Sequence, residues 1–317
     1  MRICRIDHNG SPAAAFYCDT NVVPIIAAAE AYAAKTGQRI DLPRGDDLLA
    51  FLPPDGSEHQ AAATLSQWVD EQGDDMPDDL RRPVDDVQLL VPVPRPNKLF
   101  LLAGNYAEHI EESGGIAAAR VETFPYVFMK PASTTLTDPG RPVPIPKVSP
   151  NCIDWELELA VVIGRMAKGV KEADALDYVA GYTIINDISD RRFFPNPDRT
   201  TRDKDAFFDW LHGKWHDSFC PCGPCVVSAA DVPDPQTLEM RLSVNGEVKQ
   251  QATTAQQIFP VAAVIEFISS FVTLEPGDLI STGTPAGIGA TTNTYLRAGD
   301  VLEATISEIG TLTSPVT

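Results

Sequence analysis

Residues 154–164 read DWELELAVVIG, in which two glutamates alternate with leucines before an uninterrupted apolar run. Successive side chains of an extended strand point to opposite faces, so Glu156 and Glu158 share one face while Leu157 and Leu159 share the other. One interpretation is a half-exposed strand with an acidic outer face, and the alternative is a pair of carboxylates that acts chemically. In both cases the stretch predicts a strand with two neighbouring carboxylates.

The composition of the whole chain is that of a globular protein with a strong negative charge. Its 317 residues, 44% of them hydrophobic, suffice to bury a full core. A formal net charge of −19 repels polyanions and gives no footprint for nucleic acid. No run approaches the ~18 apolar residues of a membrane span, and the start MRICRIDHNG lacks an apolar signal core. We therefore expect a cytoplasmic protein without nucleic-acid or membrane partners.

Six cysteines are too few for the disulfide framework of a small secreted domain, so we expect reduced thiols. Three of them, Cys220, Cys222 and Cys225, lie close together in HDSFCPCGPC, near two histidines. A zinc or iron-sulfur site is one interpretation, but no second cysteine pair completes four ligands. The favoured interpretation is small apolar side chains packed in a turn.

The first 92 residues differ from the rest in their pattern of apolar runs, and we expect them to form a small N-terminal α/β domain. The expected elements are two strands and two helices, over residues 1–7, 14–19, 21–37 and 57–73. The first helix should end at Gly37. An acidic, proline-bearing linker over 73–86 then leads into the second part of the chain.

Residues 93–317 consist mostly of short apolar runs separated by proline and glycine, with one long helix expected around 255–271. This organisation predicts a β-rich α+β domain. One run, KLFLLAGNYAEHIEES, ends with His109 and Glu112, a spacing that lets a carboxylate orient an imidazole on one helix face.

Two further runs also end in residues suited to chemistry. DYVAGYTIINDISDRR delivers Asp187 at the polar end of a strand, and DWLHGKWHDSF places Lys214 beside a glycine in a segment rich in aromatic residues. Taken singly, each residue has an ordinary explanation, such as a helix cap or a solvated lysine. Their joint order along the chain is more informative.

Six motifs follow one another in the order GNYAEH, YVFMKP, DWELELAVVIGR, GYTIINDISDR, GKWHDSFCPCGP and LISTGTPAGIG. With them, residues 97–317 resemble the fumarylacetoacetate hydrolase family, and the first 90 residues resemble the variable N-terminal regions of its longer members. The resemblance implies a mixed β-sandwich roll, usually a homodimer, that holds a divalent cation through carboxylates.

The resemblance assigns the cation ligands to Glu156, Glu158 and Asp187. Three carboxylates without imidazole or thiolate form a hard oxygen site, which favours Mg²⁺ or Mn²⁺ without deciding between them. Asp154 stands on the same strand face, but the family pattern gives it no ligand role.

The resemblance also implies that His109 and Glu112 orient and deprotonate a water, a suitable task for a neutral imidazole at cellular pH. Lys214 would contact substrate oxygens and handle a proton. The positions implied to bind substrate are Lys130, Thr284 and Arg191, the last by pairing with a substrate carboxylate.

Two departures from the family pattern concern the loop that follows Asp187. Where many members read N-D-x-S-A-R-D, this chain reads NDISDRR, with Asp190 in place of a small residue and Arg192 in place of an acid. An insertion, residues 193–210, follows it and is expected to act as a lid. These departures leave the ligand assignment intact but bear on how the loop faces the substrate.

The function implied by the resemblance is a metal-dependent hydrolase that cleaves a C–C bond of a 2,4-diketo acid and releases pyruvate. The substrate would be a small anionic 2-oxo acid of the acylpyruvate or diketo-deoxy sugar acid type. The alternative is a decarboxylase of oxaloacetate or a related diacid, or an isomerase and decarboxylase of aromatic catabolism. A non-catalytic binding protein is a third hypothesis, but a binder needs neither a base nor a proton donor.

Overall fold

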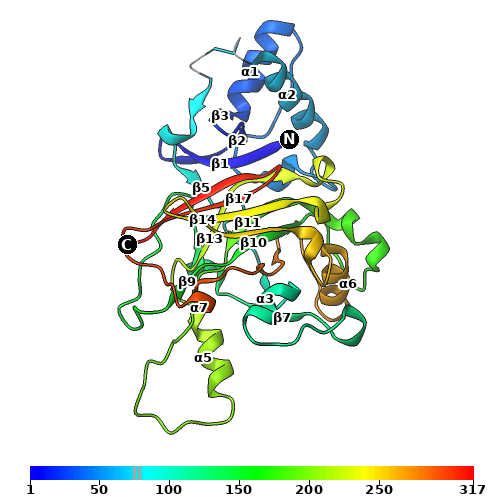
Figure 1. Cartoon of the computed structure of the whole chain (residues 1–317). Coiled ribbons are helices and arrows are strands. Elements are labelled where there is room, and N and C mark those ends of the chain that lie inside the picture. The colour runs from blue at the N-terminus through cyan, green and yellow to red at the C-terminus, as the bar shows by residue number, and fades with distance from the viewer. Residues whose placement is uncertain (74–75, 78–79) are drawn as a thin grey trace.

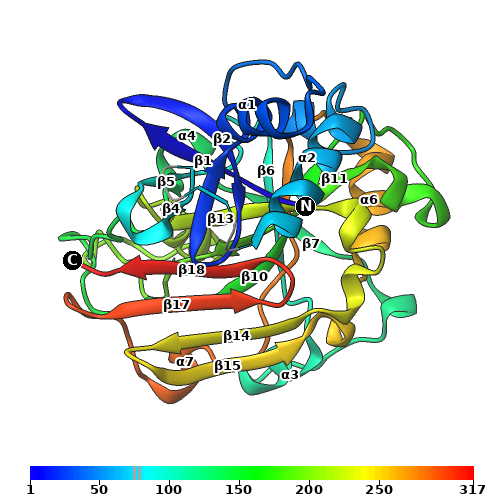
Figure 2. The ribbon, with the colours of Figure 1, turned by 90° about the horizontal axis from the view of Figure 1, so that it is seen from above.

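The computed structural model of the chain describes residues 1–73, 76–77 and 80–317. Two β-sheets stack against each other, and helices cover the outer face of the larger sheet and its flanks (Figure 1, Figure 2). The predicted β-rich α+β sandwich is confirmed. The expected linker over 73–86 falls partly on residues outside the described ones; its end forms the short strand β4 (Arg82–Pro83).

Within the described ranges, the larger sheet has 12 strands and is mixed. Its main path runs β4, β3 (Asn21–Pro24), β2 (Ser11–Tyr17), β1 (Arg2–His8), β13 (Cys220–Ser228), β11 (Val179–Asn186), β10 (Leu157–Ile163), β16 (Leu279–Ser281), β6 (Leu99–Ala103) and β7 (Tyr126–Met129). Beside this path lie β5 (Leu89–Leu90), which pairs with β1, and β8 (Leu136–Thr137), which pairs with β13. Strands β16 and β6 run parallel, as do β13 and β8, whereas the other pairs are antiparallel.

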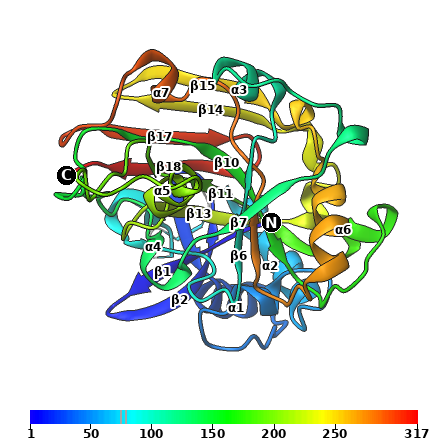
Figure 3. The same ribbon diagram turned by 90° about the horizontal axis from the view of Figure 1, so that it is seen from below.

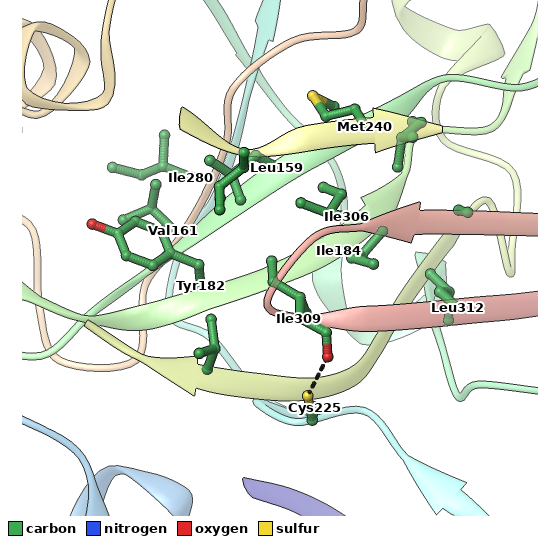
Figure 4. Close-up of a cluster of buried hydrophobic side chains, with 14 of the residues drawn as sticks. Leu159, Val161, Tyr182, Ile184, Cys225, Met240, Ile280, Ile306, Ile309 and Leu312 are labelled. Atoms are coloured by element: carbon green, nitrogen blue, oxygen red, sulfur yellow. Dashed lines mark hydrogen bonds between the residues drawn. The ribbon is translucent and has the colours of Figure 1, made fainter. Parts of the chain in front are cut away.

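A smaller antiparallel sheet packs on one face of the larger one. Its order is β15 (Glu247–Thr253), β14 (Glu239–Val244), β17 (Val301–Ile306) and β18 (Gly310–Pro315). Figure 4 shows side chains that meet between the sheets, among them Leu159, Val161, Tyr182, Ile184, Met240, Ile306 and Leu312. Because strand side chains alternate, Ala160 and Val162 point the other way, into a second core beneath the N-terminal helices. The central strands are therefore buried on both faces.

The N-terminal helices α1 (Ile25–Thr36) and α2 (His59–Gln72) cover that second core and contribute side chains to it. Helix α1 ends as predicted at Gly37, whose φ of 74° is accessible to glycine at little cost. The two predicted strands and the second helix are thus confirmed, whereas the first helix begins only at Ile25, because residues 21–24 extend the sheet as β3. In addition, β1 pairs with β13, so this segment and the rest of the chain share one sheet. The division into domains 1–92 and 93–317 stays a prediction.

The remaining helices are short and lie around the sheet edges. They are α3 (Ala107–Glu112), α4 (Ala132–Thr135), α5 (Asp205–Gly213), α6 (Val261–Phe271) and α7 (Gly289–Thr292). Helical turns of the 3-10 type occur at Leu48–Phe51, Val84–Asp86, Arg120–Glu122, Glu172–Tyr178, Ala229–Asp231, Pro235–Thr237 and Thr254–Gln256. Helix α6 is shorter than the predicted 255–271, because Pro260 occupies its N-cap and cannot continue a helix from the preceding residues. Among the described residues, no helix is both long and apolar enough to cross a membrane.

The three clustered cysteines lie in strand β13 and not in the predicted turn. All three are fully buried in the sheet, and burial raises the pKa of each thiol, that of Cys220 to about 12. Thiols that keep their protons at neutral pH are poor metal ligands and pack as small apolar groups. The turn prediction was wrong because proline and glycine suggested a break, whereas Gly223 and Pro224 are accommodated within the strand.

Candidate metal and active site

Strand pairing brings together carboxylates that are far apart in the sequence. Strand β10 pairs with β11, and the short strands β9 (Ile153–Asp154) and β12 (Ser189–Asp190) pair just beyond their ends. The amide of Asp187 donates to the carbonyl of Glu156 at 2.8 Å, which locks the two segments together. Glu156, Glu158 and Asp187 are all buried, and each offers an oxygen within 4.8 Å of the others. The strand predicted from DWELELAVVIG is confirmed over Leu157–Ile163, Asp154 belongs to the separate strand β9, and the acidic side chains are buried, so no acidic face is exposed.

The surroundings of Glu158 fit a divalent cation. Its Oε2 accepts hydrogen bonds from Ser281 Oγ at 2.6 Å and Gly283 N at 3.0 Å, whereas its buried Oε1 has no hydrogen-bond partner among the described residues. Burial, and then the nearby charges of Asp187 and Glu156, raise the pKa of Glu158 well above its ordinary value. A bound cation would satisfy the free oxygen and relieve this repulsion, so the residues present suit a hard divalent ion.

Two lysines offset part of the negative charge of the cluster. The Lys130 ammonium contacts one carboxylate oxygen of Asp187 and two backbone carbonyls. Lys214 Nζ donates to Glu156 Oε2 at 2.8 Å and to the other oxygen of Asp187 at 2.5 Å. Burial by itself lowers the pKa of Lys214, but Asp187 and Glu156 outweigh it, so the pKa is raised and the amine stays charged.

Arg191 bridges two carboxylates on the other side of the cluster. Its Nε donates to Asp154 Oδ2 at 2.8 Å, and its Nη2 lies 2.6 Å from Glu156 Oε1. Asp154 also accepts hydrogen bonds from the amides of Gly289 at 2.7 Å and Ala290 at 3.0 Å. Asp154 thus anchors both Arg191 and the loop that begins α7. The structure therefore places the predicted substrate-binding arginine in contact with protein carboxylates.

The predicted pair of His109 and Glu112 lies on α3, with Nδ1 and Oε1 2.9 Å apart. No hydrogen bond occupies His109 Nε2 among the described residues, so this nitrogen can face a water molecule. Burial opposes the ionisation of Glu156, but Lys214, Arg191 and, when it is protonated, the His109 ring together hold the pKa of that carboxyl well below its usual value. The imidazole is therefore close enough to the cluster to act electrostatically on it.

The loop after β16 joins the pair on α3 to the strands that bear the carboxylates. The amide of Gly287 donates to Glu112 Oε2 at 3.0 Å, and its carbonyl accepts from Trp155 Nε1 at 3.1 Å. Thr284 Oγ1 donates to a carbonyl at the start of β10 and accepts from Gln250 Nε2 at 2.8 Å. The hydroxyl of Thr284 is therefore held in place at Leu157, between Glu156 and Glu158.

Several residues of the site were not anticipated from the sequence. The unusual Asp190 is buried, and its carboxylate lies 3.3 Å from His216 Nε2 and accepts from the amide of Arg192 at 3.1 Å. Ser281 supports Glu158, as described above. The role of Ser281 has a sequence signal, because a serine directly follows the apolar residues Leu279 and Ile280 of a strand. The contact of Asp190 has none, because its partner His216 lies 26 positions away.

The fold and this buried carboxylate cluster define a protein that can bind a divalent cation through oxygen ligands. Residues 98–317 match the family model described as fumarylacetoacetate (FAA) hydrolase C-terminal. Because this match covers more than half of the chain, the chain belongs to the fumarylacetoacetate hydrolase family, as its motifs predicted. Members of this family include hydrolases, isomerases and tautomerases.

Relatives of known name illustrate that range. The chain is 43% identical over 224 residues to 2,4-didehydro-3-deoxy-L-rhamnonate hydrolase of Sphingomonas sp., covering 70% of this chain and 73% of the relative. It is 39% identical over 232 residues to a mitochondrial oxaloacetate tautomerase of Xenopus laevis, covering 73% and 68%. A solved maleylpyruvate hydrolase of Sphingobium sp. SYK-6, in complex with manganese (II) ion and pyruvate, superposes with a TM-score of 0.69 at 27% identity, covering 100% of this chain and 99% of the other.

Proposed function

We propose that this protein is a divalent-cation-dependent hydrolase that cleaves a C–C bond of a 2,4-diketo acid and releases pyruvate. The observation that carries the proposal is the pair of His109 and Glu112, held at 2.9 Å beside a buried cluster of three carboxylates. A base of this kind is needed to activate water. Two relatives named as hydrolases of keto acids, one of them solved with manganese and pyruvate, support the same reaction class.

Glu156, Glu158 and Asp187 would hold Mg²⁺ or Mn²⁺. The cation, when bound, polarises substrate oxygens and stabilises the negative charge that develops on them. The free Oε1 of Glu158 is the feature of this chain that favours such an ion. Lys130 and Lys214 offset only part of the negative charge, and their hydrogen bonds to the cluster go to Asp187 and Glu156.

The chain's own residues account for the proton transfers. Glu112 fixes the tautomer of His109, leaving Nε2 to accept a proton from water while the oxygen attacks the distal carbonyl carbon. The bond between that carbon and the central carbon then breaks, and its electron pair leaves with pyruvate as the enolate. The proton taken by His109 returns to the enolate carbon, giving pyruvate and a carboxylic acid. Lys214 balances charge on the oxygens.

Lys130, Thr284 and Arg191 complete the proposed substrate contacts. Arg191 already contacts Asp154 and Glu156, so we propose that it shares its charge with the substrate carboxylate and is not released from its partners. A homodimer and a cytoplasmic location stay predictions.

A second candidate is action on oxaloacetate, by tautomerisation or decarboxylation, which the 39% identity to an oxaloacetate tautomerase favours. These reactions need proton transfer or loss of carbon dioxide but no attacking water. One preparation, assayed with Mn²⁺ on acetylpyruvate and on oxaloacetate, separates the two. Release of pyruvate and acetate from acetylpyruvate supports the hydrolase, and turnover of oxaloacetate alone supports the second candidate.

A further inference from the structure

Two aromatic side chains enter the site on the same elements that deliver its lysines. Strand β7 runs directly into Lys130, and alternation places Phe128 on the same strand face as that lysine. Helix α5 runs directly into Lys214, and Trp210, four residues earlier, shares its helix face. The strand and the helix that direct the two lysines toward the carboxylates therefore also direct one aromatic ring each toward the cluster.

The two rings form a continuous wall beside the cluster. The Phe128 and Trp210 ring centroids lie 5.0 Å apart in an edge-to-face arrangement. Lys214 Nζ, which touches two of the carboxylates, lies 5.4 Å from the Phe128 centroid and 6.0 Å from that of Trp210. Phe207 extends the wall outward, 5.8 Å from Trp210 and 55% exposed. Viewed from below, α5 and β7 lie next to each other (Figure 3).

The charges around the wall do not suit a second anionic group. The ammonium groups of Lys130 and Lys214 and the guanidinium of Arg191 each contact carboxylates of the protein. A carboxylate at the far end of a substrate would lose water against the rings, where these three cations of the described chain are already paired with protein carboxylates, and this is unfavourable. An apolar group gains instead, because burying it removes apolar surface from water.

We propose that Phe128 and Trp210 form the subsite for the distal group of the substrate, and that this group is an aryl or extended alkyl group. The inference rests on the proposed function, since it takes the 2-oxo acid end to lie at the carboxylate cluster. Aromatic rings favour offset or edge-to-face contacts with another ring, so an aryl ketone is the best match. Phe128 and Trp210 would then determine specificity without taking part in the chemistry.

The test compares three 2,4-dioxo acids on the Mn²⁺-loaded protein, with a phenyl, a methyl or a carboxylate-bearing group at the distal carbonyl. We measure kcat/KM for each and, by calorimetry, Kd. The phenyl compound should exceed the other two by about tenfold or more, the usual value of filling an apolar pocket. Equal values, or a preference for the diacid, would overturn the subsite.

Variants test whether Phe128 and Trp210 cause the preference for the phenyl compound. Phe128→Leu and Trp210→Leu should reduce the phenyl-to-methyl ratio to about threefold or less. Phe271→Leu is the matched control, because Phe271 is an aromatic residue of α6, 57% exposed and outside the wall; it should leave the ratio unchanged. An unchanged ratio in both wall variants contradicts the proposal.

Failure of the subsite and failure of the proposed function give different results. If none of the three compounds is cleaved, the proposed hydrolase activity is wrong, while the calorimetric Kd ratio still decides the subsite. If all three are cleaved at equal kcat/KM with equal Kd, the hydrolase stands and the subsite is wrong. The wild-type ratio is sufficient for this decision even if a wall variant does not fold.

Discussion

The two regions that supply charged groups to the site differ sharply in their setting. Glu158 belongs to the central strand β10 and Asp187 directly follows β11, and both are fully buried and held by neighbouring segments of the sheet. The insertion 193–210 and helix α5 instead project from the body (Figure 1), and their ion pairs, such as Arg199 with Asp209, lie within the segment itself. Yet Lys214, the residue that follows α5, lies inside the cluster. Cation binding should therefore depend on the sheet, and substrate handling on the projecting segment.

The largest expected effect concerns the sheet. Exhaustive chelation should abolish turnover, and Mg²⁺ or Mn²⁺ should restore it, because three carboxylates form a hard oxygen site. Glu158→Ala should lose both cation affinity, measured by calorimetry, and turnover. Glu239→Ala, on an exposed position of β14, is the control and should retain both. Full activity after chelation would refute the carboxylate site.

The next effect separates chemistry from cation binding. His109→Ala should lower kcat by about 10²–10⁴, the usual contribution of a positioned general base, while cation affinity stays near that of the wild type. Single-turnover kinetics and calorimetry on the same preparation measure the two quantities. If the reaction is decarboxylation, which needs no attacking water, the loss should be smaller. Wild-type hydrolysis by this variant would exclude His109 as the base.

A smaller effect is expected from the projecting segment. Replacing residues 196–203 by a short glycine linker should lower kcat/KM about tenfold to a hundredfold, since it disturbs how α5 presents Lys214. The cation Kd should change by less than about twofold, because none of the three carboxylates lies in the segment. Arg199→Ala breaks only ion pairs within the segment and should have a milder effect. Equal loss of cation affinity and catalysis would contradict the separation of the two regions.

The smallest expected effect is a change in amide hydrogen exchange of the unsubstituted protein. We predict that the insertion 193–210 closes as a lid, so its amides should exchange more slowly when oxalate, a 2-oxo acid mimic, is bound to the Mn²⁺-loaded protein. Strand β10 should exchange slowly in both states, since it is buried on both faces. Equal protection of 193–210 with and without oxalate would show that the segment is a fixed part of the scaffold.

Much of the fold and of the candidate site could be predicted because their signals are local. Alternation in DWELELAVVIG predicts that Glu156, just before β10, and Glu158, within it, point the same way, and both contribute to the cluster. Three-residue spacing on α3 brings His109 to Glu112. Gly37 ends α1 through its own backbone freedom. The choice of Asp187 as their partner, in contrast, came from the resemblance and not from any local pattern.

Only the tertiary structure decided which distant segments meet. The pairing of β1 with β13, of Arg191 with Asp154, of Asp190 with His216, and of Phe128 with Trp210 joins residues between 26 and more than 200 positions apart. Local propensity carries no information about such partners, because their contact depends on how sheets and helices pack. The sequence by itself determined which faces carry carboxylates and an imidazole, and the packing of the strands determined that they converge on one buried site.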